Sequence, residues 1–267
     1  MTIKLRGRLF WGFCVLSSSG FVLAGAALWL SGFEDLERLR GSGFGSSNPL
    51  VFYAVLAAAG ASGLYAAILS GLVALRSGKT VSVEIFFFAL WAFCQSFELA
   101  KAGSLVLGIN GASSVAFEIV TRVALFGRYS GTLALFSGSL FSVGLKQERG
   151  MPVLTTSLMA GLLFASIQPL NSVLPGLDFL ADRGMASLAG VFEAVLVVLA
   201  VVNYAIAWRS GKDKAYVVAG VGLVACFSAA MLLRTTASFW TAALAVPVLV
   251  GGTWLHIKSL HDYYLWR

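Results

Sequence analysis

Eight apolar runs of about 20 residues or more divide this chain, and the fourth is longer than a span requires. An α-helix rises about 1.5 Å per residue, so a run of this length crosses the hydrocarbon core of a bilayer. The composition agrees, because 58% of the residues are hydrophobic, 12% are charged and the mean hydropathy is +0.86. We therefore predict an all-α, multi-pass membrane protein with a single transmembrane helical domain over residues 1–267. The runs are Leu9–Leu30, Leu50–Leu75, Val81–Leu107, Ser113–Leu145, Pro152–Leu170, Ala186–Trp208, Ala215–Leu233 and Phe239–Ile257.

The basic residues between the runs predict the orientation. Positive side chains are retained on the cytoplasmic side of a membrane. One set of connections and ends carries Lys4, Arg6, Arg8, Arg76, Lys79, Lys146, Arg149, Arg209, Lys212, Lys214, Lys258 and Arg267. The other set carries Arg38, Arg40, Arg183 and Arg234. We predict that both termini are cytoplasmic and that the eight helices lie in an inner or plasma membrane.

The first run allows a second interpretation. A basic start, an apolar stretch and Ala24-Gly25-Ala26 resemble a cleaved signal peptide, although about 22 residues is long for one. Cleavage would leave seven helices with an external N-terminus. We expect the run to be retained as a helix.

Two external connections are long enough to cover the bundle. Ser31–Pro49 begins with acidic and then basic residues and continues as a Gly/Ser-rich linker, and Asn171–Met185 carries two acidic residues and Arg183. They are either ordinary solvated loops or a lid over an external cavity. Small residues such as Gly127, Gly131 and Gly138 within the runs predict closely packed helices. Pro247 predicts a static kink or a mobile point in the last helix.

Charged residues inside the third and fourth runs are costly in a bilayer and need partners. Both runs meet at a turn near Gly108–Gly111, so residues equally far from that turn lie at equal depth. This counting pairs Glu98 with Arg122 and Lys101 with Glu118 across the hairpin. Spacings of three and four residues also pair Glu98 with Lys101, and Glu118 with Arg122, within each helix. We predict a four-member structural ion-pair network.

Arg128 is predicted to stand apart from this network. It lies six residues beyond Arg122, which turns it about 120° around the helix, away from the third run. We expect its acidic partner to be Glu193 on the sixth run, with Gln95 and Tyr129 near enough to donate or accept hydrogen bonds. These four residues are the candidates for a ligand site or an ion pathway, and a purely structural ion pair is the alternative.

Several chemistries find no support in the sequence. There is no Gly-x-x-x-x-Gly-Lys-Ser/Thr loop for a nucleotide. His256 and His261 lie at the cytoplasmic end of the last run, where we expect contact with lipid headgroups or solvent rather than a metal. Cys14, Cys94 and Cys226 form no spacing pattern and are predicted core residues. The net charge of +7 is better explained by basic residues in the short connections of a membrane protein than by nucleic-acid binding. We predict no catalytic residue, metal, cofactor or nucleic-acid partner.

One short segment resembles a known motif. Phe117-Glu118-Ile119-Val120-Thr121-Arg122 is similar to the Glu-Glu-x-x-x-Arg motif of intramembrane glutamyl proteases of the CAAX-endopeptidase type. Phe117 replaces the first Glu, and the later histidines of that family are missing. The resemblance, over six residues, implies at most an inactive relative.

The expected function is therefore non-enzymatic. We predict a sensory or partner-binding membrane module whose polar centre holds a ligand, with a small anionic ligand and a protein partner or second copy as candidates besides the lipid bilayer. The alternative is a small secondary transporter or channel for an anionic solute or protons, which would use Arg128 and Glu193 at mid-depth.

Overall fold

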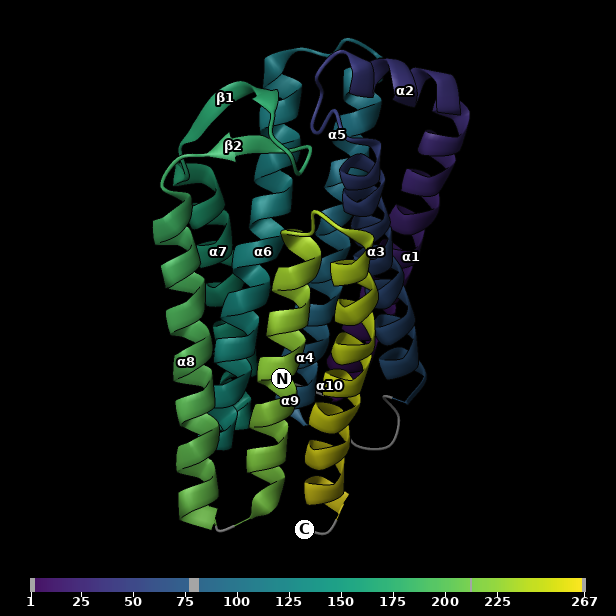
Figure 1. Ribbon diagram of the computed structural model, residues 1–267. Helices are drawn as coiled ribbons and strands as arrows, with labels where there is room; N and C mark the ends of the chain where they lie inside the picture. The colour runs from purple at the N-terminus through teal and green to yellow at the C-terminus, as the bar shows by residue number, and fades with distance from the viewer. Residues whose placement is uncertain (1–2, 77–81, 212, 266–267) are drawn as a thin grey trace.

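The computed structural model describes residues 3–76, 82–211 and 213–265. Long helices run side by side along one axis, and a small cap covers the upper end in the view of Figure 1. The elements in chain order are α1 (Ile3–Ser31), α2 (Phe33–Gly41), α3 (Pro49–Arg76), α4 (Val83–Cys94), the 3₁₀ segment η1 (Gln95–Leu99), α5 (Ala100–Ile109), α6 (Ser114–Ser142), η2 (Gln147–Arg149), α7 (Gly150–Ile167), β1 (Leu170–Pro175), β2 (Ala181–Arg183), α8 (Ala186–Gly211), α9 (Lys214–Arg234) and α10 (Phe239–Leu265).

Within the described residues, seven helices are long and apolar enough to cross a membrane. They are α1, α3, the α4–η1–α5 unit, α7, α8, α9 and α10. The fourth predicted run forms α6, which is 29 residues long and lies inside the bundle, but it is not among these seven helices. Each apolar run therefore coincides with a long helical segment, and the described residues form an all-α, membrane-type helical bundle.

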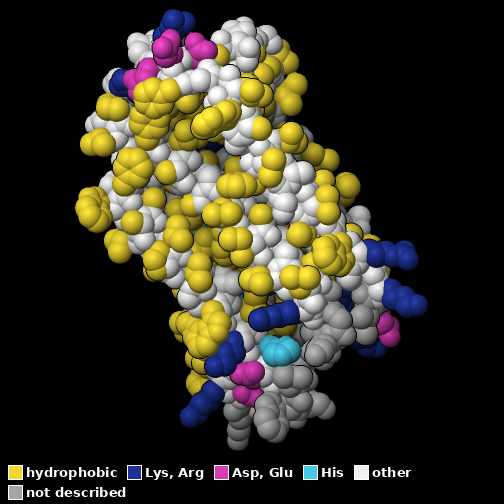
Figure 2. Space-filling view, turned by 90° about the vertical axis from the view of Figure 1, so that its right-hand side faces the viewer, with side chains coloured by type: hydrophobic (Ala, Val, Ile, Leu, Met, Phe, Trp, Pro, Cys, Tyr) yellow, Lys and Arg dark blue, Asp and Glu magenta, His cyan; other side chains and the backbone are white. Residues whose placement is uncertain are grey.

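The surface supports contact with lipid. Along α8, Leu188, Val191, Val195, Val198 and Val202 recur every three or four residues and are each between 45% and 63% exposed. In water such a stripe would need a partner. Figure 2 shows hydrophobic side chains covering the middle of another face, with charged side chains gathered toward its two ends. Apolar atoms thus face outward over the depth that a bilayer would occupy.

The third predicted span is the central element of the bundle. Its α4 section begins at Ser82, whose hydroxyl accepts a hydrogen bond of 3.1 Å from the Ile85 amide. Phe86, Phe87 and Trp91 are fully buried there. The span then tightens into η1 before continuing as α5. The sequence predicted one regular helix and missed this change.

Glycines bring α6 against the central span. A Cβ added at Gly131 would lie 3.0 Å from the Cβ of Cys94, and one added at Gly127 would overlap Phe97. Only a residue without a side chain allows this approach. The predicted role of small residues in close helix packing is confirmed at these two positions.

The cap consists of residues 33–48, which include α2, and residues 169–184, which include a two-stranded antiparallel hairpin. The segment 171–185 was predicted as a loop, so its strands are a correction. The rings of Phe52 and Phe179 lie 4.8 Å apart, and those of Phe44 and Phe179 lie 6.4 Å apart. These contacts join the two connections to each other and to α3. We call this assembly the outer cap.

Candidate functional site

A buried carboxylate, Glu98 in η1, is the centre of the most polar region inside the bundle. Arg128 of α6 donates to both of its oxygens, at 2.8 and 3.0 Å. Lys101 Nζ lies 3.1 Å from Glu98, and Arg234 Nε of α9 lies 3.4 Å away. The side chains of all four residues are at most 5% exposed. We call Gln95, Glu98, Lys101, Arg128, Glu193 and Arg234 the charged cluster.

The 3₁₀ geometry of η1 explains why the central span supplies three members of the cluster. With three residues per turn, side chains at i and i+3 eclipse one another. Gln95 and Glu98 are related in this way within η1, and Lys101 follows three residues later at the start of α5. The polar side chains are therefore lined up on one side of an otherwise apolar element.

Arg234 is held more loosely than Arg128. Its Nη1 lies 3.3 Å from Glu193 and its Nη2 lies 3.4 Å from the Gln95 amide oxygen. These distances exceed the usual 2.7–3.2 Å range of N–H···O bonds. Among the residues that the structure describes, the buried Nε makes no hydrogen bond. Arg234 therefore retains donor capacity that its protein partners do not use.

The outer cap completes the charge balance. Lys101, Arg128 and Arg234 face two buried acids, Glu98 and Glu193. A third acid, Asp178 at the turn of the hairpin, lies 3.7 Å from Arg128 with a side chain that is 33% exposed. Asp178 therefore places a third negative charge beside the three cations of the cluster, and the same hairpin also brings Arg183 near Arg128.

The turn that carries Asp178 is anchored beside it. Phe179 is fully buried with φ at 64°, a left-handed conformation that is uncommon for a non-glycine residue. The Ala181 amide donates to Thr121 Oγ1 of α6 at 3.0 Å. Burial lowers the pKa of the nearby Arg183, and the positive charge of Arg128 lowers it further. The hairpin therefore sits directly over Arg128.

The predicted four-member network is wrong in its cross-helix pairs. Glu118 and Arg122 do pair within α6, at 2.7 Å, but their side chains are 48% and 32% exposed. Arg122 Nη1 also donates to the Ala165 carbonyl at the end of α7, at 2.9 Å. Free carbonyls at a helix C-terminus attract a cation. The predicted Glu98–Lys101 pair is confirmed. This pair is buried in the bundle, whereas the Glu118–Arg122 pair lies at the surface.

The predicted partner of Arg128 is also corrected from Glu193 to Glu98. The turn between α5 and α6 is centred between residues 111 and 112, so Leu125 lies at the depth of Glu98. Arg122 and Arg128 are each three residues from Leu125. Side chains lean toward the N-terminus of their helix, which moves Arg128 toward this depth and Arg122 away from it. The structure reverses the prediction, because Arg128 contacts the central span and Arg122 contacts the end of α7.

The other two predicted site residues separate. Gln95 belongs to the charged cluster through Arg234, not through Arg128. The Tyr129 hydroxyl donates to the Gln168 amide oxygen at 2.8 Å, and its ring packs against Phe164 and Phe192. Gln168 in turn donates to the Gly184 carbonyl at the base of the hairpin. Tyr129 is therefore connected through Gln168 to the outer cap, and its hydroxyl does not bond to the charged cluster.

Arg234 was missed because the orientation count placed it in an external connection. It is the last residue of α9, and only 6% of it is exposed. The available signal was its position directly after the apolar residues Leu232 and Leu233, at the external end that Glu193 also approaches. A long guanidinium at such a position can reach back into the bundle.

His256 corrects another expectation. Its ring is buried, with Nδ1 2.8 Å from the Ala219 carbonyl, and it stacks on Phe88 with ring centres 4.4 Å apart. Cys94 and Cys226 are buried as predicted, and Cys14 is half-buried. In the described ranges, no three His, Cys, Asp or Glu residues are grouped as a metal site would require.

Comparisons with known proteins add no relative. No protein-family model, curated protein or solved structure matches the chain.

Proposed function

We propose that the protein is a non-enzymatic sensory module of the membrane, in which the charged cluster binds a small anionic ligand beneath the outer cap. The observation that carries this proposal is the state of Arg234, a buried guanidinium with long contacts and a donor that makes no hydrogen bond. Buried donors are normally satisfied, so an exception calls for an explanation. A carboxylate or phosphate-like anion would supply the missing acceptor.

A sensor needs a conformational change on ligand binding, and in this proposal the change is a movement of the outer cap. Asp178 neutralises the third cation of the cluster from a partly exposed position. A bound anion would take over this role, and the hairpin would then lose its ionic contact with Arg128. Ligand binding and cap position are coupled in this arrangement, because both draw on the same positive charge. The signal would pass to a protein partner or a second copy.

The proposal includes the topology that the sequence predicts. Counting α6 as a span gives eight crossings and two cytoplasmic termini in an inner or plasma membrane. The arrangement in Figure 1 supports this, because the C-terminus lies at the lower end and the N-terminus in the lower half, away from the cap. An even number of crossings returns a chain to its starting side.

The test is ligand-induced stabilisation of the purified protein. Thermal unfolding is measured with a panel of small carboxylates, phosphate and sulfate, and a ligand at 100 times its Kd should stabilise by about 2.7 kcal/mol. We expect Arg234→Gln to abolish the response and Arg122→Gln, a matched change outside the cluster, to preserve it. Stabilisation that survives Arg234→Gln would contradict the proposed site.

Flux measurements separate this function from transport. In reconstituted vesicles the sensory module should move none of the anions that stabilise it. Anion or proton flux that Arg234→Gln abolishes would instead establish the alternative, a small transporter. The apolar packing of Phe86, Phe87 and Trp91 between the cluster and the opposite end favours the sensor, because these fully buried rings oppose a polar path.

A further inference from the structure

A groove of about 510 Å³ lies between α3 and α10, on the side of the bundle away from α8, and the described residues that line it include no member of the charged cluster. Its outer walls are apolar and exposed, and its floor includes Leu69 and Leu249, which are 7% and 2% exposed. The volume is typical of a site for a small molecule. The exposed wall residues are Leu64, Ile68, Leu72, Val246, Val250 and Trp254.

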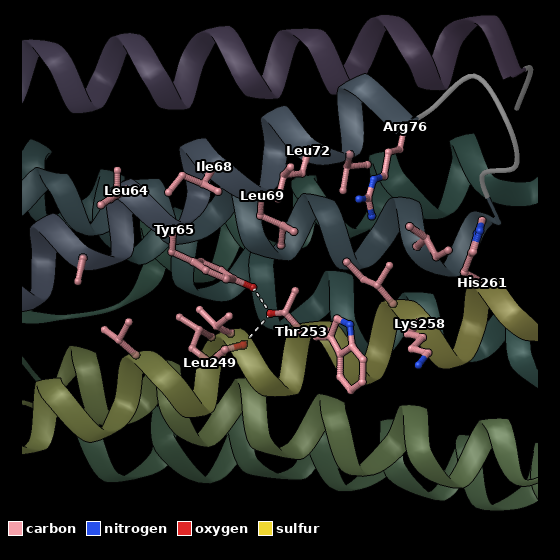
Figure 3. Close-up of a pocket in the computed structure, with 17 residues that line it drawn as sticks. Leu64, Tyr65, Ile68, Leu69, Leu72, Arg76, Leu249, Thr253, Lys258 and His261 are labelled. Carbon is pink, nitrogen blue, oxygen red and sulfur yellow. Dashed lines mark hydrogen bonds between the residues drawn. The ribbon is translucent and has the colours of Figure 1, made fainter.

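One polar contact joins the two walls of the groove. The hydroxyls of Tyr65 on α3 and Thr253 on α10 lie 2.7 Å apart across the floor, as Figure 3 shows. α10 packs mainly along α9 and meets α3 less extensively. The groove is therefore a gap between two helices that are joined at one level, and it opens onto the lipid-facing surface.

One end of the groove is basic. Figure 3 shows Arg76, Lys258 and His261 together at the end opposite Leu64 and Tyr65. Among the residues that the structure describes, the lining includes no acidic side chain. Lys258 Nζ also lies 4.6 Å from the centre of the Trp254 ring, which holds the ammonium at the groove.

The dimensions match one leaflet of a bilayer. Along α3 the groove extends from Ala61 to Arg76, which is about 22 Å at the helical rise. Half of a hydrocarbon core is about 15 Å, so the apolar part spans a leaflet while Arg76 and Lys258 reach the interface. Both basic residues belong to the side predicted to be cytoplasmic, where anionic lipids concentrate.

From these features we propose that the groove binds one anionic phospholipid, with its acyl chains along the apolar walls and its phosphate beside Arg76 and Lys258. Charge complementarity selects this occupant over a neutral lipid or an apolar helix, since neither would use two cations at one end. The site is independent of the proposed ligand site under the outer cap.

The experiment is a lipid titration followed by native mass spectrometry of delipidated protein in detergent. Phosphatidylglycerol is compared with phosphatidylcholine of identical acyl chains. We expect the wild type to bind one phosphatidylglycerol at least about tenfold more tightly, since each basic residue at an anionic headgroup contributes about fivefold. Arg76→Gln/Lys258→Gln should reduce this preference to less than about threefold.

Two further variants keep the proposal falsifiable. Arg209→Gln/Lys214→Gln removes the same charge from exposed positions on the same side and should keep the preference. Ile68→Trp fills the groove and should weaken binding of both lipids. Equal binding of the two lipids by the wild type, or loss of the preference in the control variant, would overturn the proposal. So would a lipid-free dimer that disappears in Ile68→Trp, because the groove would then be an interface between copies.

Discussion

At the scale of single residues, two arginines of one helix show how position decides the cost of a charge. Arg128 is enclosed and makes two hydrogen bonds to Glu98. Arg122, less than two turns away, lies at the surface with Glu118. An exposed ion pair contributes little, whereas removing one partner of a buried pair leaves an uncompensated charge. The same substitution should therefore have unequal effects.

We expect Arg128→Ala to reduce the free energy of unfolding by about 3–5 kcal/mol. Arg122→Ala, the matched control, should cost about 1 kcal/mol or less. Denaturant titrations in detergent micelles measure both values. Similar losses for the two variants would show that Glu98 does not depend on Arg128.

At the scale of elements, the long helices were predictable and the irregular ones were not. Hydrophobic runs give the position of α8 or α9 because burial in lipid depends on length and composition alone. The η1 segment has no such signal, and it packs against α3 and α6, which the local sequence does not reveal. The hairpin was missed because β1 and β2 are short and pair over a turn that only tertiary contacts such as Phe179 fix. Arg234 was counted with an external connection, and its partners in η1 and α8 are brought to it only by the tertiary fold.

The seam between α6 and the central span gives a prediction for an element. Gly127→Ala places a Cβ against Phe97, and such overpacking costs about 1–3 kcal/mol. Gly60→Ala is the control, because a Cβ in the middle of α3 there meets nothing within 4 Å. It should be neutral or stabilising by up to about 1 kcal/mol. The measurement is the Tm of both variants in the same detergent. Equal changes in Tm would argue against the close contact between Gly127 and Phe97.

The docking of α2 onto α3 should depend on pH. The Tyr53 hydroxyl donates to Glu37 at 2.7 Å, and this bond, with a further contribution from Arg40, lowers the pKa of Glu37. A depressed folded-state pKa stabilises the contact above the ordinary carboxyl range, and that stability is lost as pH falls through the depressed value. We expect the protection factors of α2 amides, which are exchange rates corrected for the intrinsic effect of pH, to be high at pH 7 and 5 and lower below about pH 4.

Tyr53→Phe is the control for this pH effect. It removes the hydrogen bond while keeping the ring, so the variant should lose much of the difference between neutral and acidic pH. An unchanged pH profile in Tyr53→Phe would assign the effect to another carboxyl group.

At the scale of the whole molecule, polarity is distributed by depth. The outer cap and the charged cluster lie toward one end, and the basic end of the α3–α10 groove lies toward the other. The end with the outer cap therefore holds both exposed charges, such as Arg38 and Asp35, and the buried cluster, whereas the groove brings Arg76 and Lys258 to the other end. One end of the protein thus presents a buried ionic cluster beneath the cap, and the other presents basic side chains at a groove.

The predicted topology can be checked with an impermeant thiol reagent on intact cells. Ser42→Cys in the outer cap should be labelled from outside, and Glu148→Cys before α7 should be labelled only after the membrane is opened. Both residues are exposed in the structure. Cys94 and Cys226 are buried, and Cys14→Ser removes the half-buried thiol. Labelling of both positions from one side would contradict the predicted orientation.

The 3₁₀ form of η1 has a mechanical consequence. Its five residues rise about 2.0 Å and turn about 120° each, against about 1.5 Å and 100° in an α-helix. Rewinding them as α-helix would shorten the central span by about 2.5 Å and rotate α4 by about 100° relative to α5. Because Glu98 lies within this segment, a rearrangement of its ionic contacts acts on the pitch of the span itself. A change of charge near the cap would thereby be coupled to a movement of α4, which extends from η1 toward the opposite end of the bundle.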